Sequence, residues 1–575
     1  MKARVPRFSF SMVLGVLALA GLLLLASGPL MGISSSASEG GGFSPINPAY
    51  LEFLQLQEQA AQDPVSAQSS QTRGLGYIPS PLDLSDLVIS PPGVEESLPP
   101  AAAFETTFDL RSQNRVSPVK DQGSYNTCWA FAAMGSSEGG LLRFASSPNP
   151  SERDFSEWHL SYLAYKDTAS RSFTLGTDDV FMKGGNDWKS IALLARWTGI
   201  ASEASSPYGG AYPTGSEPQV FHLQDAYFLP IRSGVSFSAE NVKTALKNYG
   251  PVTVAFFWDS PNFNTSKSAY YYSGSSNPNH AVLIVGWDDN YAASNFKATP
   301  PGNGAWIVKN SWGTDWGSNG FFYLSYYDSS LEGGIAYKAD EGENYARVYD
   351  YDPLGWVGSW GSYTPTGAYT PSNTAWMANV FTAAAAEPLR AVSFYAGSSN
   401  TAYEIRVYRG VTDGNPRSGQ EAASQPQGGT LGVPGYRTVV LDNAVNLQKN
   451  ERFSIVVKLT TPSTIRPIPV EYRVAGYSDN ASASANQSFV SLDGTTWQDA
   501  STLSNSSNVC LKAFAGTGSA STIPSSPETP AETGPTTPSD PDGSGGGGGG
   551  CNAAGLPFAG FFLLVPLFAL ARGKP

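Results

Sequence analysis

The residue types best suited to covalent chemistry in this sequence are cysteine and histidine, and both are scarce. Cys128 is the first of three cysteines, and it stands beside a tryptophan in the stretch QGSYNTCWAF. A cysteine attacks a carbonyl only as the thiolate, so it needs a base or a cationic partner. Because the chain has only three histidines, the partner can be sought by elimination.

The three histidines lie in different sequence patterns. His159 lies in FSEWHLSYLAYK, whose apolar spacing predicts a packed helix, and His222 lies in the alternating, strand-like pattern VFHLQD. Both patterns favour a structural histidine. His280 instead opens the apolar run HAVLIVGW directly after a polar turn. A residue at the end of a buried strand is held rigidly and can still face a cleft, so His280 is the predicted base.

Two further side chains complete the predicted site. A catalytic imidazole is oriented through its second ring nitrogen, and Asn310, at the end of the next strand in WIVKNSWG, is placed to do this. Trp312 can shield that contact from water. Gln122, in the loop before Cys128, and the backbone N–H of Cys128 can donate to a developing oxyanion. A helix that begins at Cys128 also lowers the thiol pKa through its dipole.

These motifs resemble those of the papain-like cysteine peptidases. PVKDQGSYNTCWAF, NHAVLIVGW and WIVKNSWGTDWGSNGFFYL occur in the family's order within residues 108–326. The resemblance implies that Cys128 is the nucleophile and His280 the general acid and base. It also implies that Asn310 orients the imidazole and that Gln122 is the oxyanion donor. The expected fold is α+β, with a helical left half and a β-barrel-like right half, and no metal or cofactor is expected.

The segment GGNDWKSIALLARWTGIASEASSPYGG resembles the family's substrate cleft. By that resemblance its two glycines offer backbone hydrogen bonds to an extended substrate, although a plain turn before a helix explains them equally well. The neighbouring polar residues are expected near the pocket for the second residue upstream of the cut. The predicted substrate-binding residues are Gly184, Gly185, Asn186, Asp187, Asn279 and Trp312.

The sequence departs from the family at Tyr125, where a second cysteine is usual. The cysteine that would pair with it near Gly184 is also missing, since Lys183 stands there. The peptidase fold is therefore expected to be held by packing alone, and Cys128 has no local thiol with which to form a disulfide. The segment before the domain lacks the long helical pattern of common papain propeptides, which leaves open how it would block the cleft.

The chain's 575 residues are too many for one core, so several units are expected. Residues 1–37 have the basic start and apolar run of a secretory signal, with a retained N-terminal anchor as the alternative. Residues 38–103 are rich in Pro, Ser and Gln and predict a pro-segment or tether, with one short helix in LEFLQLQEQAAQ.

Residues 104–340 mix helical and strand patterns, which predicts the α+β peptidase domain. Apolar residues at helical spacing predict helices over residues 128–144, 156–165, 191–197 and 239–249. Short β-rich runs bounded by Gly, Pro or Asn predict strands over residues 251–258, 281–287, 304–310 and 320–326.

Residues 341–516 contain short strands separated by Gly, Asn and Pro turns, which predicts an all-β sandwich. The domain order and strand pattern resemble lectin-like domains that follow papain-like peptidases in bacterial surface proteins. Four polar residues there suggest Ca²⁺, but turn formation is the favoured explanation for them: Asp350, Asp352, Asp413 and Asn415. Three tryptophans suit sugar stacking, yet burial in the sandwich is favoured for them: Trp356, Trp360 and Trp376.

Residues 517–550 form a Pro/Ser/Gly-rich linker that ends in six glycines, which predicts flexibility. Residues 551–575 combine a cysteine, an apolar stretch and a basic end. This pattern resembles bacterial C-terminal sorting signals of the Synerg-CTERM kind, with a simple transmembrane anchor as the alternative. By this resemblance the tail would be cut near Cys551 and the protein retained at the cell surface, and a membrane contact is predicted through this segment.

The predicted function is an exported, surface-anchored cysteine endopeptidase acting on proteins or peptides. A net charge of −13 argues against nucleic acid as a partner, because phosphate binding needs a basic face. Two alternatives stay open. The chain can be an adhesin whose β-domain binds a glycan or protein, with a secondary peptidase unit, or an acyl transferase that uses the same site.

Overall fold

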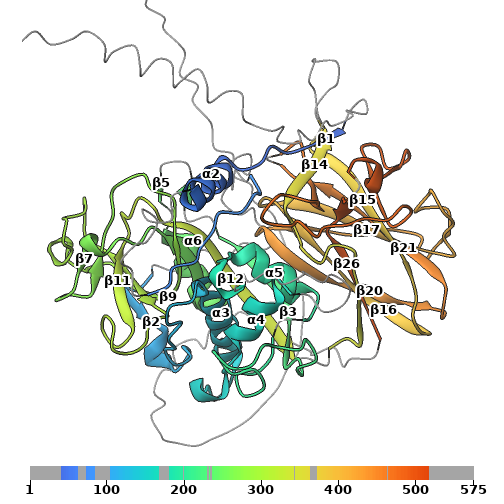
Figure 1. The fold of residues 1–575 in the computed structure, drawn as a ribbon. Coiled ribbons are helices and arrows are strands. Elements are labelled where there is room, and N and C mark those ends of the chain that lie inside the picture. The colour runs from blue at the N-terminus through green and yellow to red at the C-terminus, as the bar shows by residue number, and fades with distance from the viewer. Residues whose placement is uncertain are drawn as a thin grey trace, which may run out of the picture. The chain divides into compact units, whose positions relative to one another are not determined.

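The structure is a computed structural model (Figure 1), and it describes residues 41–62, 73–83, 104–166, 180–198, 200–229, 232–233, 236–237, 239–341, 344–362, 372–462, 464–504 and 506–516. The predicted signal (1–37), linker (517–550) and C-terminal segment (551–575) lie outside these ranges. Within the ranges, none of the helices is long and apolar enough to cross a membrane.

The central strands of the peptidase part are apolar and buried. β9 (His280–Asp288) runs antiparallel to both β6 (Val252–Phe256) and β10 (Ala305–Lys309), and β11 (Phe321–Ser325) pairs with β10. These four confirm the predicted strands. The remaining strands of this part are β2 (Thr107–Asp109), β3 (Phe221–Phe228), β4 (Arg232–Ser233), β5 (Ser236–Phe237), β7 (Phe263–Asn264), β8 (Ala269–Tyr270) and β12 (Glu332–Glu341).

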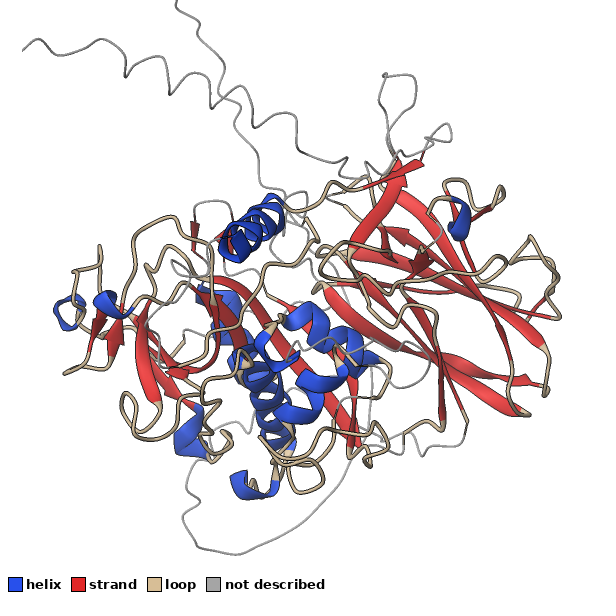
Figure 2. Cartoon of the chain, in the orientation of Figure 1, coloured by secondary structure: helices blue, strands red, loops and turns tan. Residues whose placement is uncertain are grey.

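The predicted helices of the peptidase part are also present, and Figure 2 shows them in blue beside the strands. They are α3 (Cys128–Phe144), α4 (Glu157–Leu163), α5 (Asp187–Ala195) and α6 (Ala239–Asn248). Helix α3 packs against β9 and β12. Helix α5 begins earlier than its apolar pattern indicates, because the side chain of Asn186 accepts a hydrogen bond from the N–H of Lys189 and caps it.

The part that follows is built from strands, as the sequence predicts. They are β13 (Arg347–Tyr349), β14 (Gly358–Ser362), β15 (Thr374–Thr382), β16 (Glu387–Ala396), β17 (Thr401–Arg409), β18 (Gln420–Glu421), β19 (Gln427–Leu431), β20 (Gly435–Leu447), β21 (Arg452–Thr460), β22 (Ile468–Glu471), β23 (Ser488–Ser491), β24 (Gln498–Asp499), β25 (Asn508–Val509) and β26 (Leu511–Ala515). Short 3₁₀ turns cover Leu110–Gln113, Pro150–Glu152, Val180–Met182, Ser260–Asn262, Ala293–Asn295 and Ala500–Thr502.

One sheet of 13 strands continues from the peptidase part into the β-rich part. The connection is made where β20 pairs antiparallel with β3, with Gly435 opposite Tyr227 and Tyr436 opposite Ala226. The buried carboxylate of Asp225 reinforces this joint by accepting from the backbone N–H of Thr438 at 3.0 Å. Within the described residues the strand order of this sheet has two ends, β13 and β7, so the sheet is open.

The segment before the peptidase part packs against the β-rich part. β1 (Gly41–Phe43) adds to the edge of β14 as an antiparallel strand. Helix α2 (Pro48–Gln62), which confirms the predicted short helix, follows it. Its residue Tyr50 is fully buried, donates to the carbonyl of Ala475 at 2.7 Å and meets the ring of Tyr477 edge-on. These residues are thus part of the folded unit.

Candidate active site

Cys128 is the first residue of α3, and its side chain is fully buried. The loop before it is held in place because the N–H of Gln122 donates to the carbonyl of Ser311 at 2.8 Å. The N–H of Ala281, the residue after His280, donates to the Cys128 sulfur at 3.3 Å. Strand β9 therefore brings the residue next to His280 into contact with the thiol.

The hydrogen bonds around His280 determine which ring nitrogen can act as a base. The N–H of Ser311 donates to Oδ1 of Asn310 at 2.8 Å, which identifies that atom as the oxygen. A carbonyl oxygen only accepts, so His280 Nε2, 2.8 Å from it, carries the ring proton. His280 Nδ1 then keeps its lone pair, and this buried atom has no hydrogen-bond partner among the described residues.

Trp312 covers the histidine–asparagine contact. Its ring stacks on the His280 ring with the centroids 4.6 Å apart, and its side chain is buried. Trp258 and Trp316 meet the Trp312 ring edge-on from two sides. This aromatic layer excludes water from the hydrogen bond between His280 and Asn310.

Residues 73–83, which we call the cleft segment, lie across this site. The carbonyl of Gly74 accepts a hydrogen bond from Nε2 of Gln122 at 3.0 Å. The N–H groups of Gly76 and Tyr77 both donate to the carbonyl of Asn279 at 3.1 Å. The cleft segment therefore lies against the loop before Cys128 and against the residue before His280.

The two predicted cleft glycines have different contacts. Gly185 donates its N–H to the carbonyl of Gly76 at 2.8 Å and accepts from the N–H of Ile78 at 3.0 Å. The carbonyl of Gly184 is instead taken by the hydroxyl of Tyr165 at 2.7 Å. Gly185 thus forms a parallel β-bridge with Tyr77 of the cleft segment.

Of the polar residues predicted near the pocket, some contact the cleft segment and one points into the core. The side chain of Asn186 reaches the cleft segment, because its Nδ2 donates to the carbonyl of Ile78 at 3.0 Å. Asn279 contributes its backbone there, while its side chain bonds to the backbone of Trp258. Asp187 points into the core, where Thr253 and Tyr337 each donate to it at 2.9 Å. Burial raises the pKa of this carboxyl to about 6.

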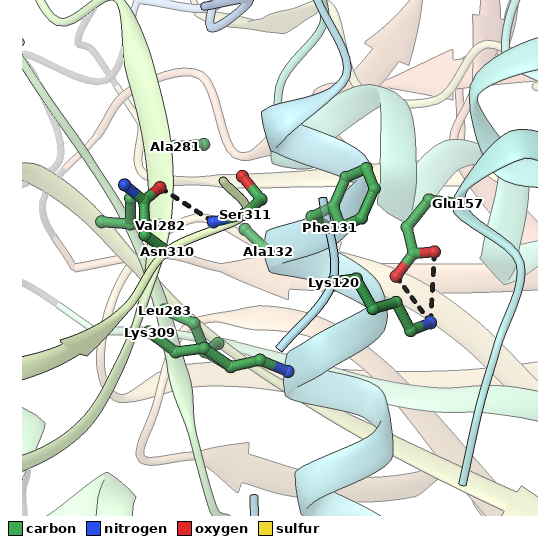
Figure 3. Close-up of a pocket in the computed structure, with 10 residues that line it drawn as sticks. All are labelled: Lys120, Phe131, Ala132, Glu157, Ala281, Val282, Leu283, Lys309, Asn310 and Ser311. Atoms are coloured by element: carbon green, nitrogen blue, oxygen red, sulfur yellow. Dashed lines mark hydrogen bonds and ion pairs between the residues drawn. The ribbon is translucent and has the colours of Figure 1, made fainter. Parts of the chain in front are cut away.

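A mostly buried group of charges lies beside the site, and the sequence analysis did not predict it. Lys120 Nζ lies within 3.3 Å of three carboxylates, those of Asp154, Glu157 and Glu138. Burial lowers the pKa of Lys309, next to Asn310, to about 8, and this ammonium donates to the hydroxyl of Ser117 at 2.9 Å. Figure 3 shows both lysines lining a small cavity with Asn310 and Ser311. These contacts anchor the chain on either side of the site.

Tyr125 packs in an aromatic cluster at the position where the family usually has a cysteine. Its ring meets those of Trp158, Phe181 and Tyr208 edge-on, with centroids 5.1 to 6.1 Å apart. Such pairs stabilise beyond the area that they bury. Cys128 is a free cysteine, and the packing of Tyr125 adds to the hydrogen bonds that hold this loop.

The other two histidines have structural surroundings. His159 is buried in α4, with Nε2 3.3 Å from a carboxylate oxygen of Glu217. His222 stacks on Trp197, and its Nδ1 lies 2.9 Å from Oδ1 of Asn344. Neither contact involves a residue of the predicted site.

The polar residues considered above for Ca²⁺ have protein partners. Asp352 lies 2.7 Å from the buried ammonium of Lys512, and Asp350 lies 3.8 Å from the same group. Asp413 pairs with Arg452, and Asn415 Oδ1 accepts from the backbone of its own turn. Of the three tryptophans, Trp356 and Trp360 are buried, and Trp376 is partly buried.

Burial shifts the pKa values of the thiol and of the imidazole toward their uncharged forms. It raises the pKa of Cys128 to about 12 and lowers the pKa of His280 to about 4. At neutral pH the thiol stays protonated and the imidazole stays neutral. The ion pair that makes a cysteine nucleophilic is therefore disfavoured in this structure.

This electrostatic state predicts a pH dependence that changes when the segment leaves. In the intact chain we expect no thiolate at Cys128 at neutral pH, because its raised pKa keeps it protonated there. After a cut introduced within residues 84–103 and dissociation of the preceding residues, we expect thiolate at neutral pH. The measurement is the ultraviolet thiolate absorbance of the chain minus that of a Cys128→Ala chain. A thiolate signal at neutral pH in the uncut chain would contradict the prediction.

Comparison with known proteins places two families on the chain. Residues 104–340 match the model described as papain family cysteine protease, and residues 348–515 match the model described as lectin like domain. Cysteine proteinase 2 of Dictyostelium discoideum is 29% identical over 255 residues, which cover 38% of this chain and 62% of that protein. Cathepsin K of Gallus gallus is 30% identical over 223 residues, covering 38% and 58%. The chain thus spans about 60% of the length of these relatives.

Solved structures extend the similarity over both parts. The cysteine protease and lectin-like domains of Cwp84, a surface layer associated protein of Clostridium difficile, align with a TM-score of 0.65 at 25% identity, covering 84% of this chain and all of that one. A cysteine-to-alanine variant of Cwp84 after propeptide cleavage aligns with a TM-score of 0.60 at 27% identity, covering 72% and 100%. This chain therefore carries a papain family cysteine protease domain followed by a lectin-like domain.

Proposed function

We propose that the chain is a cysteine endopeptidase whose site consists of Cys128, His280, Asn310 and Gln122. The observation that carries the proposal is the fixed tautomer of His280, which leaves a buried basic nitrogen on the strand that contacts the thiol. Membership of residues 104–340 in the papain family supports the same chemistry.

The proposed reaction has two steps, acylation of Cys128 and hydrolysis of the thioester, and His280 transfers the protons in both. His280 Nδ1 takes the thiol proton as the Cys128 sulfur attacks the peptide carbonyl. Gln122 Nε2 and the backbone N–H of Cys128 donate to the oxyanion. The C–N bond then breaks, and the imidazolium gives its proton to the leaving amine. Water, deprotonated by His280, hydrolyses the thioester and restores the thiol.

The hydrogen bonds of the cleft segment support these roles. The carbonyl of Gly74 accepts a hydrogen bond from Gln122 Nε2, which is the donor proposed for the oxyanion. Gly185 and Asn279 hold the segment as an extended strand. We propose that a substrate takes the place of this strand and that the full-length chain is a latent precursor.

We also propose that the chain acts at the cell surface. The signal-like residues 1–37 would direct export, residues 38–103 would be removed as a pro-segment, and residues 551–575 would retain the protein at the membrane. The likeness to a surface layer associated protein of Clostridium difficile supports this location. Its substrates would then be proteins exposed outside the cell.

The test is to expose the chain to a thiol-directed epoxide and locate the adduct by mass spectrometry. A cut within residues 84–103 should release hydrolysis of a peptide library, and the epoxide should stop hydrolysis while modifying Cys128. Hydrolysis that survives complete modification of Cys128 would refute the proposed nucleophile. Absence of hydrolysis in a cut chain from which the preceding residues have dissociated would refute the peptidase function itself.

A further inference from the structure

The lectin-like domain touches the cleft through Tyr477. This residue follows β22, and its side chain is buried. Its hydroxyl lies 2.8 Å from Oδ1 of Asn186. Asn186 in turn donates from Nδ2 to the carbonyl of Ile78 in the cleft segment at 3.0 Å. One chain of two hydrogen bonds therefore connects the second domain to whatever strand lies in the cleft.

The contacts of Asn186 fix the direction of its amide. Oδ1 accepts from two groups, the hydroxyl of Tyr477 and the backbone N–H of Lys189 at 3.1 Å. With two donors on the oxygen, Nδ2 must face the cleft. Asn186 is fully buried, so this donor would lose its protein partner when Ile78 leaves. A buried donor without a partner is costly, and an incoming carbonyl removes that cost.

Tyr477 is itself held firmly. The buried Nζ of Lys189 donates to the backbone carbonyl of Tyr477 at 2.9 Å and lies 4.1 Å from the centroid of its ring, and burial lowers the pKa of Lys189 to about 7. Lys189 belongs to α5 of the peptidase domain, so the contact crosses the domain boundary. The hydrogen bond holds Tyr477 in either protonation state of Lys189, and the charged form is attracted to the ring as well. The hydroxyl is thus presented to Asn186 from a fixed position.

We propose that the lectin-like domain completes the substrate cleft, with Tyr477 as a positioning residue that aims the Asn186 amide at a backbone carbonyl of the bound peptide. The partner is an extended protein strand, held at the position that Ile78 occupies. The inference rests on the proposed peptidase function, and it adds that the peptidase domain alone lacks part of its binding site. Tyr477→Phe removes the hydroxyl and keeps the ring that packs on Lys189.

The first test needs no catalysis. In a Cys128→Ala full-length chain, hydrogen exchange of the amides in the cleft segment reports how tightly that strand is held. Adding Tyr477→Phe should speed this exchange by roughly three- to tenfold, the range expected for one hydrogen bond. The matched control is Tyr351→Phe, which removes a hydroxyl bonded to the carbonyl of Val380 inside the lectin-like domain, and it should have no effect. Equal exchange in the Tyr477 and Tyr351 variants would overturn the proposal.

A second variant separates positioning from direct contact. Ser80 of the cleft segment also hydrogen-bonds to Tyr477. If the hydrogen bond between Ser80 and Tyr477 explained the faster amide exchange by itself, Ser80→Ala would speed the exchange equally. Tyr477→Phe would then cause no further increase in the Ser80→Ala chain. We expect the Tyr477 effect to persist there. Its loss would overturn the positioning role.

The third measurement uses the cut, active chain. Tyr477→Phe should raise KM about three- to tenfold for peptides long enough to reach Asn186, and kcat should change little, because no reacting atom is touched. A substrate with only one amino-acid residue before the cleaved bond is too short to reach Asn186, so its KM should not change. If peptide length makes no difference, the proposal fails while the peptidase function stands. If the parent chain hydrolyses nothing, the function fails, and the exchange experiment still decides the role of Tyr477.

Discussion

Cys128→Ala is expected to lower kcat/KM for peptide hydrolysis by at least about 10³-fold in the chain cut within residues 84–103. Without the sulfur no acyl-enzyme can form, and the remaining oxyanion donors provide only the residual catalysis seen when a nucleophile is removed. His280→Ala should have an effect of the same order, because both residues act in the same proton transfer. The double variant should therefore have a kcat/KM only a little lower than that of either single variant.

The chain offers a matched control for this substitution in Cys510. This second free cysteine is also buried, and it lies in the lectin-like domain near Asp352 and Lys512. Cys510→Ala should leave hydrolysis per folded molecule unchanged. Full hydrolysis by the Cys128→Ala chain, or equal losses in the two variants, would contradict the assignment. The experiment therefore separates a nucleophile from a cysteine that only packs.

Local patterns were sufficient to predict the elements that carry the site. The helix from Cys128 to Phe144 and the strands on either side of the turn between His280 and Asn310 follow from apolar spacing and turn residues close together in sequence. Scarcity of histidine made the choice of His280 possible. Strands β9 and β10 are neighbours in both sequence and space, which is why side-by-side placement of the two residues could be expected.

Contacts between segments that are far apart in the chain could not be predicted in this way, because no local sequence pattern marks them. The pairing of β20 with β3 joins residues about 200 positions apart, and no periodicity marks it. Tyr477 and Asn186 lie 291 positions apart, and no periodicity marks their contact. The cleft segment contains the short phrase RGLGYIP, within a region whose composition predicts only a pro-segment or tether. Its two glycines were the available signal, because alternate glycines mark places where another backbone approaches closely.

Gly76→Ala and Gly74→Ala are expected to open the cleft of the uncut chain. A Cβ at residue 76 would lie 2.3 Å from the carbonyl oxygen of Asn126, and one at residue 74 would lie 1.9 Å from that of Tyr125. Both obstacles are backbone atoms of the loop that leads into Cys128. That loop cannot yield without disturbing the start of α3, so the cleft segment has to move away instead.

The size of this effect follows from the cost of forcing extra atoms into a packed contact, about 1–3 kcal/mol. At ~2 kcal/mol the population of the open cleft rises by about 30-fold. We expect either variant to speed epoxide labelling of Cys128 in the uncut chain by that factor. Leu56→Ala is the matched control, because this α2 residue belongs to the same N-terminal region and its side chain is 56% exposed. Unchanged labelling in both glycine variants would show that the cleft segment does not limit access to the thiol. Faster labelling by the Leu56 variant as well would show that any weakening of the N-terminal region opens the site, and that the close glycine contacts have no special part in keeping it shut.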